Sequence, residues 1–208
     1  MKPSRVAVLA CVLAIAPMAA HTLKAQQPPA ATEIGAELKA LTLLPATGGA
    51  KLTVSTPAFA DGGDIPFENT QYRGNVFPGL AWSAGPSGTR VYAVIMQDLD
   101  GMRNGAPILH WTMANIPAGV TKLDAAMSAP PAGAEYGPNI RAAAQAYLGP
   151  RTPAGPKHRY HFQVFALDTT LPADALATYP AMTESMKGHV LASGEVVGLG
   201  QVMPPAAP

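Results

Sequence analysis

The sequence contains a single cysteine, Cys11, which lies in an apolar run near the start of the chain. If this run is removed as part of a leader, the mature protein has no thiol, which excludes a disulfide framework and a cysteine-based zinc site. Its stability must then come from packing. The apolar stretch before Cys11 is too short for a lipoprotein signal, so we do not expect lipid attachment there.

Charged residues are also scarce, because they make up 13% of the chain, and lysine and arginine never form a run. Removing residues 1–25 deletes Lys2, Arg5 and Lys24 but no acid, so 14 basic against 13 acidic residues become 11 against 13, a net charge of −2. Nucleic-acid-binding proteins normally carry a clustered basic face. We therefore expect no nucleic-acid partner.

The signatures of common enzymes are absent from the sequence too. No two histidines have the HExxH spacing of a helical zinc site, and there is no GxSxG turn and no phosphate-binding glycine loop. We therefore expect no cofactor. A metal site made of Asp98, Asp100, His110 and His158 is the least favoured possibility, because residues so far apart show no ligand spacing.

The first residues have the pattern of a secretory signal peptide. Lys2 and Arg5 precede the apolar run 6–16, and small residues around Ala20 or Ala25 offer a cleavage point. A run this short does not cross a hydrocarbon core of about 30 Å. We expect cleavage of residues 1–25, a periplasmic or secreted mature protein, and no transmembrane span in that protein.

The remaining sequence predicts one domain, residues 51–203, preceded by an arm or linker at residues 26–50. In the arm, Ile34, Leu38 and Leu41 have the spacing of a short helix. With 48% hydrophobic residues the chain can form one core, and its 20 glycines and 22 prolines suit many turns between short strands.

Four segments have the patterns of strands. Leu52 and Val54 alternate with polar residues up to Pro57, residues 91–96 are nearly all apolar as in a strand covered on both faces, and residues 107–117 form another strand. Residues 159–168 alternate, so that two sets of side chains take opposite faces: Tyr160, Phe162, Val164 and Ala166 against His161, Gln163, Phe165 and Leu167. Such strands with turn-rich joints predict a mainly β, antiparallel sandwich.

One helix is expected near the end of the chain, in residues 183–194. Thr183 is its expected N-cap, Glu184 lies in its first turn, and Gly194 can end it. Residues 195–200 then return as a strand.

Polar residues stand at the ends of the apolar strands. Asp98 and Asp100 follow one strand, His110 lies inside the next, and His158 precedes a third. If these strands are neighbours, the side chains can meet in one pocket. Each residue also has an ordinary explanation, because an aspartate at a strand end often caps a turn and a histidine beside Trp111 often belongs to a core.

Six blocks, in this order, resemble the bacterial branch of the phosphatidylethanolamine-binding protein family, often called Raf kinase inhibitor-like: "TPAFADGGDIP", "LAWS", "AVIMQDLDG", "LHWTMANIP", "GP…P…HRY" and "MKGHVLASGEVVG". The resemblance covers roughly residues 52–200. It implies a Greek-key antiparallel β-sandwich with a C-terminal helix, and a small pocket that takes an anion such as the phosphate head group of a phospholipid.

The resemblance also implies a set of ligand-binding residues: Asp98, Asp100, His110, Gly149, Pro150, Pro153, His158 and Tyr160. We expect His110 and His158 to donate hydrogen bonds to the anion, and Asp98 to orient an imidazole. Tyr160 is expected to supply a hydroxyl or a pocket wall. A loop of prolines and glycines can hold its backbone N–H groups toward an anion.

The sequence departs from the family pattern at several points. Leu99 stands where the family usually has a proline between the two aspartates, and Pro78-Gly79 and Thr152-Pro153 stand in place of double prolines. The segment "GMRNGAP" before the His-Trp block is an insertion that can reshape the rim of the pocket.

These observations favour a non-enzymatic periplasmic or secreted binding protein that takes small phosphate-type anions. Two alternatives stay open. One is a module that binds or inhibits an envelope or host protein. The other is a hydrolase that uses a His/Asp pair, for which the sequence offers no recognisable nucleophile.

Overall fold

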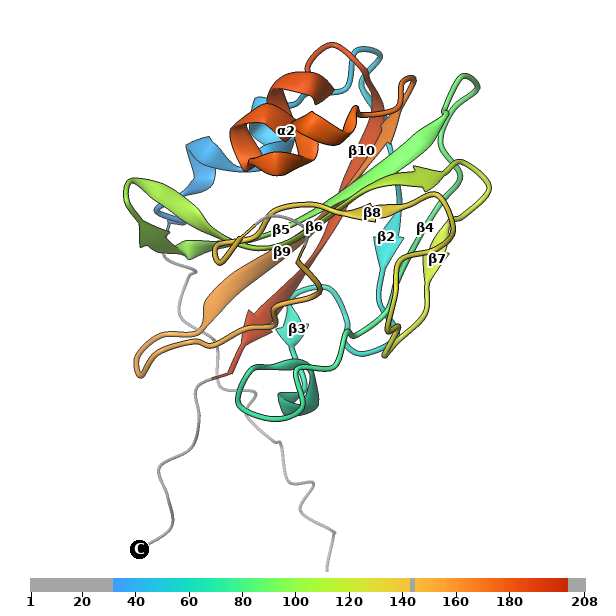
Figure 1. Ribbon diagram of the computed structural model, residues 1–208. Helices are drawn as coiled ribbons and strands as arrows, with labels where there is room; N and C mark the ends of the chain where they lie inside the picture. The colour runs from blue at the N-terminus through green and yellow to red at the C-terminus, as the bar shows by residue number, and fades with distance from the viewer. Residues whose placement is uncertain (1–31, 143–144, 202–208) are drawn as a thin grey trace, which may run out of the picture. The chain divides into compact units, whose positions relative to one another are not determined.

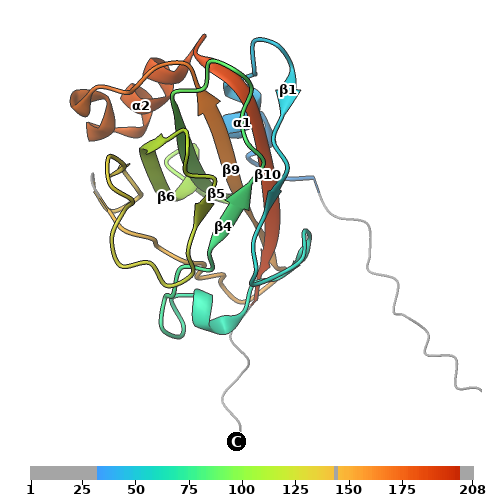
Figure 2. The ribbon, with the colours of Figure 1, turned by 90° about the vertical axis from the view of Figure 1, so that its right-hand side faces the viewer.

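The computed structural model describes residues 32–142 and 145–201, so the expected signal peptide and residues 26–31 lie outside the described residues. Within that part of the chain, ten strands form two sheets. Four long antiparallel strands make the middle of the large sheet, in the order β10 (Val190–Gly200), β9 (His158–Leu167), β5 (Val91–Arg103) and β6 (Ala106–Pro117). Figure 2 shows these four strands side by side.

The short strands complete the two sheets. In the large sheet, β1 and β3 run parallel to β10, and β8 pairs with β6: β1 (Ala50–Lys51), β3 (Gly63–Asp64) and β8 (Glu135–Tyr136). The small sheet is antiparallel and consists of β2 (Val54–Ser55), β4 (Leu80–Trp82) and β7 (Lys122–Leu123). The expected antiparallel sandwich is confirmed, with two short parallel pairs added along β10.

The large sheet is buried on both faces. The small sheet covers one face, and the other packs against α1 (Ala40–Leu43), η3 (Ala173–Ala177) and α2 (Tyr179–Met186), as Figure 1 shows. Val94 therefore lies in one core and Ile95 in the other, which confirms that residues 91–96 form a strand covered on both faces. The alternation expected in β9 is also confirmed, since Phe162 and Phe165 lie in different cores.

Helix α2 begins earlier than the sequence predicted. Its N-cap is Thr178, whose hydroxyl accepts a hydrogen bond from the N–H of Ala181 at 3.3 Å. Thr183, the expected cap, lies inside the helix and donates to the carbonyl of Tyr179. The expectation placed the cap one turn late because several residues of this stretch are equally good capping residues.

The end of α2 also differs from the expectation. The helix stops just before Gly188, whose φ of 77° lies in the left-handed region that glycine adopts freely. Gly194, the expected terminator, lies inside β10, where an added Cβ would come within 2.1 Å of the carbonyl oxygen of Leu52. This glycine therefore permits a close approach of two backbones.

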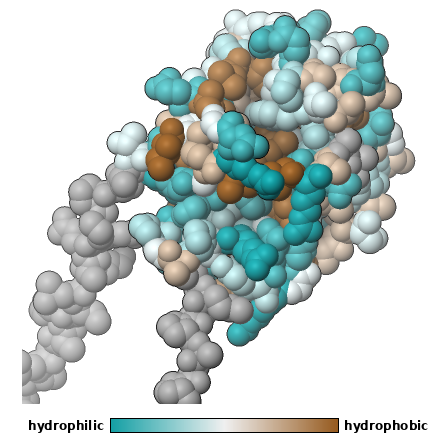
Figure 3. Space-filling view, turned by 60° about the vertical axis from the view of Figure 1, so that its left-hand side comes forward, coloured by the Kyte–Doolittle hydropathy of each residue, from teal (hydrophilic) through white to brown (hydrophobic). Residues whose placement is uncertain are grey.

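Residues 33–46 pack on the helix-covered face of the large sheet. After η1 (Ala36–Leu38), the first N–H groups of α1 at Ala40 and Leu41 donate to the buried side chains of Gln97 and Gln163, at 2.9 Å and 2.8 Å. The two glutamines thus cap a helix start whose N–H groups would otherwise be unpaired. Ile34 stays 73% exposed, and the face in Figure 3 shows hydrophobic residues in separate spots between hydrophilic ones.

Across residues 32–142 and 145–201, the helices are all too short or too polar to cross a membrane.

Candidate functional site

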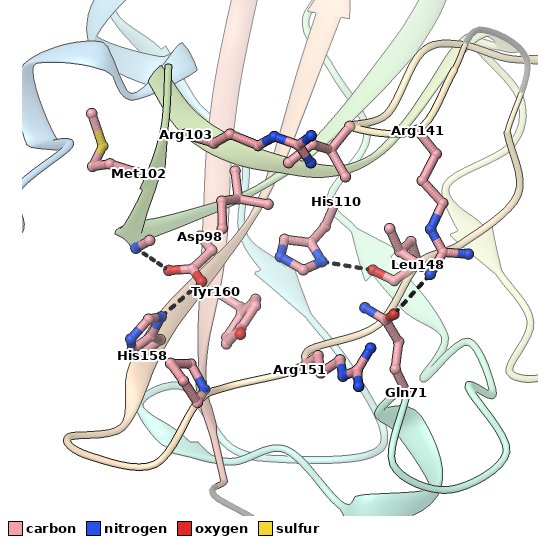
Figure 4. Close-up of a pocket in the computed structure, with 14 residues that line it drawn as sticks. Gln71, Asp98, Met102, Arg103, His110, Arg141, Leu148, Arg151, His158 and Tyr160 are labelled. Carbon is pink, nitrogen blue, oxygen red and sulfur yellow. Dashed lines mark hydrogen bonds and ion pairs between the residues drawn. The ribbon is translucent and has the colours of Figure 1, made fainter. Parts of the chain in front are cut away.

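A pocket of about 400 Å³ lies at the end of the large sheet where β5, β6 and β9 meet several loops (Figure 4). Five of the eight residues expected to bind a ligand line this pocket: Asp98, His110, Pro153, His158 and Tyr160. They come from three strands and one loop that are far apart in the sequence. Tyr160 in its wall also belongs to the core between the large and the small sheet.

The Asp98 carboxylate holds one wall of the pocket. Its Oδ2 atom lies 2.8 Å from Nδ1 of His158, and its Oδ1 atom accepts hydrogen bonds from the N–H groups of Asp100 and Gly101, at 3.0 Å and 2.8 Å. Asp98 is only 2% exposed, so these bonds compensate the burial of its charge. They also stiffen the turn that lacks the usual proline, and buried Leu99 anchors it.

His158 is oriented by that carboxylate. Because a carboxylate oxygen accepts, Nδ1 of His158 carries the proton, and Nε2 is left without a partner among the described residues. The ring lies at the start of β9 and lines the pocket. The structure therefore brings Asp98 and His158 together as an aspartate–imidazole pair at the pocket wall.

His110 reaches the same pocket through a β-bulge in β6. Met96 pairs with Trp111 and Gln97 with Leu109, so His110 is an extra residue on its strand. A bulge re-aims side chains, and here the His110 ring packs edge-on against Tyr160, with ring centroids 5.0 Å apart. Trp111 itself is fully buried in the core.

The His110 ring has one satisfied nitrogen and one unpartnered nitrogen. Nδ1 lies 2.9 Å from the carbonyl oxygen of Leu148 and therefore donates, while Nε2 is buried and has no hydrogen-bond partner among the described residues. Burial lowers the pKa of His110 and outweighs the opposite effect of the Asp98 charge and of the nearby carbonyl groups. The neutral ring thus leaves a nitrogen lone pair unpaired in the interior, which is costly and calls for a partner.

Tyr160 forms the wall between the two histidines. Its hydroxyl lies 3.1 Å from Oγ1 of Thr152. Burial, reinforced by the charge of Asp98, raises the pKa of Tyr160, so the hydroxyl keeps its proton. It can therefore donate a hydrogen bond to a ligand or to Thr152.

Asp100 lies outside the pocket. Its carboxylate forms an ion pair with Arg159, with Oδ2 2.8 Å from Nε and the backbone N–H of Arg159 also donating at 2.8 Å. Burial opposes the charge of Asp100, but the hydrogen bonds and charge of Arg159 prevail and lower its pKa. Arg159 and His161 point away from the face of Tyr160, as the alternation in β9 predicted.

Gly149 and Pro150 support the pocket without lining it. The N–H of Gly149 donates to Oδ1 of Asn75, its carbonyl accepts from Nε2 of Gln71, and the carbonyl of Pro150 accepts from the N–H of Gln71. The expectation that this loop turns its backbone N–H groups to an anion therefore does not hold for Gly149. A Cβ there would lie 2.3 Å from the carbonyl of Asn69, at the end of η2 (Phe67–Asn69), so the loop needs glycine.

Sequence reasoning missed four polar residues that line the pocket: Gln71, Arg103, Arg141 and Arg151. The arginines are single residues on separate segments, so a search for basic runs cannot find them. Arg103 ends β5, which was expected to stop before Asp98. The insertion forms a hairpin whose turn residues Asn104 and Gly105 both have positive φ, 54° and 79°. This Asn-Gly pair was the available signal.

Within residues 32–142 and 145–201, no three His, Cys, Asp or Glu side chains gather in a way that could hold a metal ion. The pocket chemistry consists instead of two imidazoles, one paired carboxylate, a phenol and three guanidinium groups. Hydrogen-bond donors and positive charge of this kind suit an anion.

Comparisons with known proteins identify relatives over most of the described chain. A family model described as "Phosphatidylethanolamine-binding protein" matches residues 55–201. A "UPF0098 protein" of Methanothermobacter thermautotrophicus is 34% identical over 155 residues, which cover 71% of this chain and 97% of the other. A Mycobacterium tuberculosis chain named "Putative lipoprotein LppC" is 32% identical over 155 residues, 74% of each chain. The crystal structure of YbcL from E. coli, titled a new member of the mammalian PEBP family, matches with a TM-score of 0.67 and 26% identity, covering 74% of this chain and all of that one.

Proposed function

The chain belongs to the phosphatidylethanolamine-binding protein family, and on this premise we propose that it is a non-enzymatic binding protein whose pocket holds small phosphate-type anions, such as a phospholipid head group. Membership of the family supports a binding-type protein. The proposal that the ligand is an anion depends on one observation. His110 and His158 line the same pocket, and their Nε2 atoms have no partner among the described residues.

The tautomers of the two histidines suggest how a phosphate would bind. Each ring donates from Nδ1 to a protein oxygen, so each Nε2 is an acceptor while the ring is neutral and a donor once the ring is protonated. A phosphate hydroxyl can donate to a neutral Nε2, and a fully ionised phosphate can draw a proton onto the ring. Asp98 would stabilise the positive charge on His158 in the second case.

A role without catalysis is supported by the groups that line the pocket. Among the described residues, those that line it include no serine, threonine or cysteine that could act as a nucleophile. The raised pKa of Tyr160 keeps its hydroxyl protonated, which makes it a poor nucleophile.

Titration calorimetry with inorganic phosphate and phenyl phosphate tests this proposal. We expect His158→Ala and Asp98→Asn to weaken both affinities at least about tenfold, because each removes a charge-assisted hydrogen bond. Asparagine keeps an acceptor for the two N–H groups of the turn, so this variant preserves the fold. A matched control is His189→Ala, since His189 forms an exposed pair with Asp168 at 2.8 Å outside the pocket. No binding by the wild type, or unchanged affinity in both pocket variants, overturns the proposal.

We also propose that the protein is exported with loss of residues 1–25 and acts in the periplasm or outside the cell. The charged, apolar and small-residue parts of the N-terminal sequence support export, and the name of the mycobacterial relative is consistent with an envelope location. Cell fractionation and mass spectrometry of the tagged full-length protein test this. A cytoplasmic protein that keeps Met1 contradicts it.

A hydrolase is the second candidate, and one observation favours it. The Asp98–His158 pair has the geometry in which an imidazole can act as a general base toward a water molecule. Turnover of a phosphate or carboxylate ester by the purified wild type, lost in His158→Ala, supports the hydrolase, and its absence leaves the binding role.

A further inference from the structure

Three arginines line the pocket, and none of them forms an ion pair with any described carboxylate. Arg103 comes from the β5–β6 hairpin, Arg141 from the loop after β8, and Arg151 from the proline-rich loop before β9. Figure 4 shows the three side chains around the pocket, with Asp98 and His158 at its other end. All three are exposed, so their charges are free to meet a ligand at the mouth.

Arg141 is held in place by the same residue that fixes the adjacent loop. Its guanidinium donates to Oε1 of Gln71 at 3.1 Å, and Nε2 of Gln71 donates to the carbonyl of Gly149 at 2.6 Å. A guanidinium with its orientation set in advance loses less entropy when it binds a phosphate.

The described residues of the pocket provide no comparable set of groups that would bind a cation. Asp98 is the only acidic residue in the part of the lining that the structure describes, and both oxygens of its carboxylate are already used, by His158 and by two backbone N–H groups. Three arginines against one aspartate leave the lining positively charged with neutral histidines. An ammonium group would therefore meet net positive charge and no free carboxylate, and the unpaired Nε2 atoms of the neutral histidines are the acceptors that the phosphate itself uses.

Phosphate ligands differ in charge and in the number of terminal oxygens, and both properties affect how strongly they bind to arginines. A phosphomonoester carries a charge of about −1.5 to −2 at pH 7 and has three terminal oxygens. A phosphodiester has one negative charge and two terminal oxygens, and an ethanolamine ester adds a positive charge that cancels it. Guanidinium groups bind phosphate oxygens as two-pronged donors, so three of them match the monoester better.

We propose that the pocket selects phosphomonoesters over zwitterionic phosphodiesters of the phosphatidylethanolamine type, and that Arg103, Arg141 and Arg151 set this preference. The inference rests on the proposed function and names the ligand class of the same pocket. His110 and His158 hold the phosphate in either class, while the arginines discriminate by the charge and the number of terminal oxygens.

Two probes that differ only by the ethanolamine ester test the preference, namely glycerol 3-phosphate and glycerophosphoethanolamine. We expect the wild type to bind glycerol 3-phosphate at least about tenfold more tightly in calorimetry at pH 7.5 and low salt, because about one unit or more of additional negative charge faces the arginines. The preference should shrink as salt is raised, since exposed charges are screened.

The triple variant Arg103→Gln/Arg141→Gln/Arg151→Gln should reduce the preference to less than about threefold while still binding glycerophosphoethanolamine, because the histidines remain. The matched control is Arg90→Gln, which removes one exposed arginine just before the opposite end of β5 and should change neither affinity. Equal affinity of the wild type for both probes, or an unchanged preference in the triple variant, overturns the inference while anion binding stands. If neither probe binds, the proposed function and this inference fail together.

Discussion

The two faces of the large sheet treat buried histidines in opposite ways. On the helix-covered face, His161 has a carboxylate oxygen at each ring nitrogen, Glu195 at 2.8 Å and Glu33 at 2.9 Å. On the face toward the small sheet, His110 has a carbonyl at one nitrogen and no described partner at the other. Both rings are almost fully buried, at 3% and 4% exposure.

In the network around His161, both ring nitrogens and both neighbouring carboxylates have partners. Lys39 bonds Glu195 at 2.8 Å, and Arg159 joins Glu33 to Asp100. Burial opposes the charge of Glu195, but hydrogen bonds from His161 and Lys39 prevail and lower its pKa. Because Glu33 and Lys39 precede the domain strands, these bonds fasten residues 32–44 to the sheet.

The contrast separates the polar groups around His161, which stabilise the fold, from the unpartnered nitrogen of His110, which is available to a ligand. A fully satisfied buried network specifies packing, whereas an unpartnered buried atom costs stability and persists where binding needs it. The comparison therefore predicts that equivalent substitutions on the two faces have reciprocal effects on stability and binding.

The largest expected effect is that of His161→Leu on stability. The substitution leaves Glu33 and Glu195 partly buried without their shared partner, and we expect the free energy of unfolding to fall by about 3 kcal/mol. Urea denaturation measures this loss, and phosphate affinity should stay within about twofold. The control His189→Leu breaks an exposed pair and should cost less than about 0.5 kcal/mol. Equal losses in the two variants would remove the proposed difference between a buried and an exposed pair.

The reciprocal substitution, His110→Leu, should affect binding more than stability. It removes an unpartnered nitrogen and also the donor to Leu148, so the free energy of unfolding should change by less than about 1 kcal/mol. Affinity for inorganic phosphate should fall at least about thirtyfold, or about 2 kcal/mol, because a charge-assisted hydrogen bond is lost. A variant that unfolds as easily as His161→Leu but binds phosphate normally contradicts the comparison.

The two faces should also respond to acid in different pH ranges. Burial lowers the pKa of His110 below its ordinary 6.5, so the unfolded chain takes up a proton there that the folded protein refuses, and stability falls as pH drops below 6.5. The pKa values of Glu195 and Asp100 are lowered from their ordinary values of 4.5 and 3.8, so these carboxylates stabilise the fold at pH values above 4.5 and 3.8. That stabilisation is lost only as the pH falls below those values. Between pH 7 and 5.5 we expect a loss of about 1 kcal/mol in the wild type that is absent in His110→Leu. Denaturant titrations at each pH measure it, and parallel curves for the two proteins exclude His110 as the cause.

The strands were predictable from sequence because burial on both faces of a sheet produces a recognisable pattern of apolar residues. The apolar run at 91–96 and the alternation at 159–168 follow directly from a sheet covered on both sides. Asp98 and His158 were found together because they occupy the ends of neighbouring strands. The position of α2 was missed because Thr178 and Thr183 are both acceptable caps, and only packing decides between them.

The rest of the pocket depended on features that a sequence pattern does not display. His110 reaches it through a bulge, which shifts the register by one residue and has no fixed signal. Arg103, Arg141 and Arg151 are brought together by three loops, so their common location is a property of the fold. Asp100 looked equivalent to Asp98, because residues two apart on a regular strand share a face. The pairing of β5 with β6 is irregular between Asp98 and Met102, and the Asp100 carboxylate binds Arg159 instead of lining the pocket.

The smallest expected effect concerns Gln71, which links Arg141 to the loop at Gly149. Gln71→Met removes both hydrogen bonds while keeping a side chain of similar length. Because Arg141 is exposed, its bond to Gln71 contributes little, and we expect affinity for glycerol 3-phosphate to fall by no more than about threefold. Affinity for glycerophosphoethanolamine should change less, since that ligand depends less on the arginines. Calorimetry with both probes measures the difference, and a loss as large as that of His110→Leu would show that Gln71 belongs to the binding groups and not to their support.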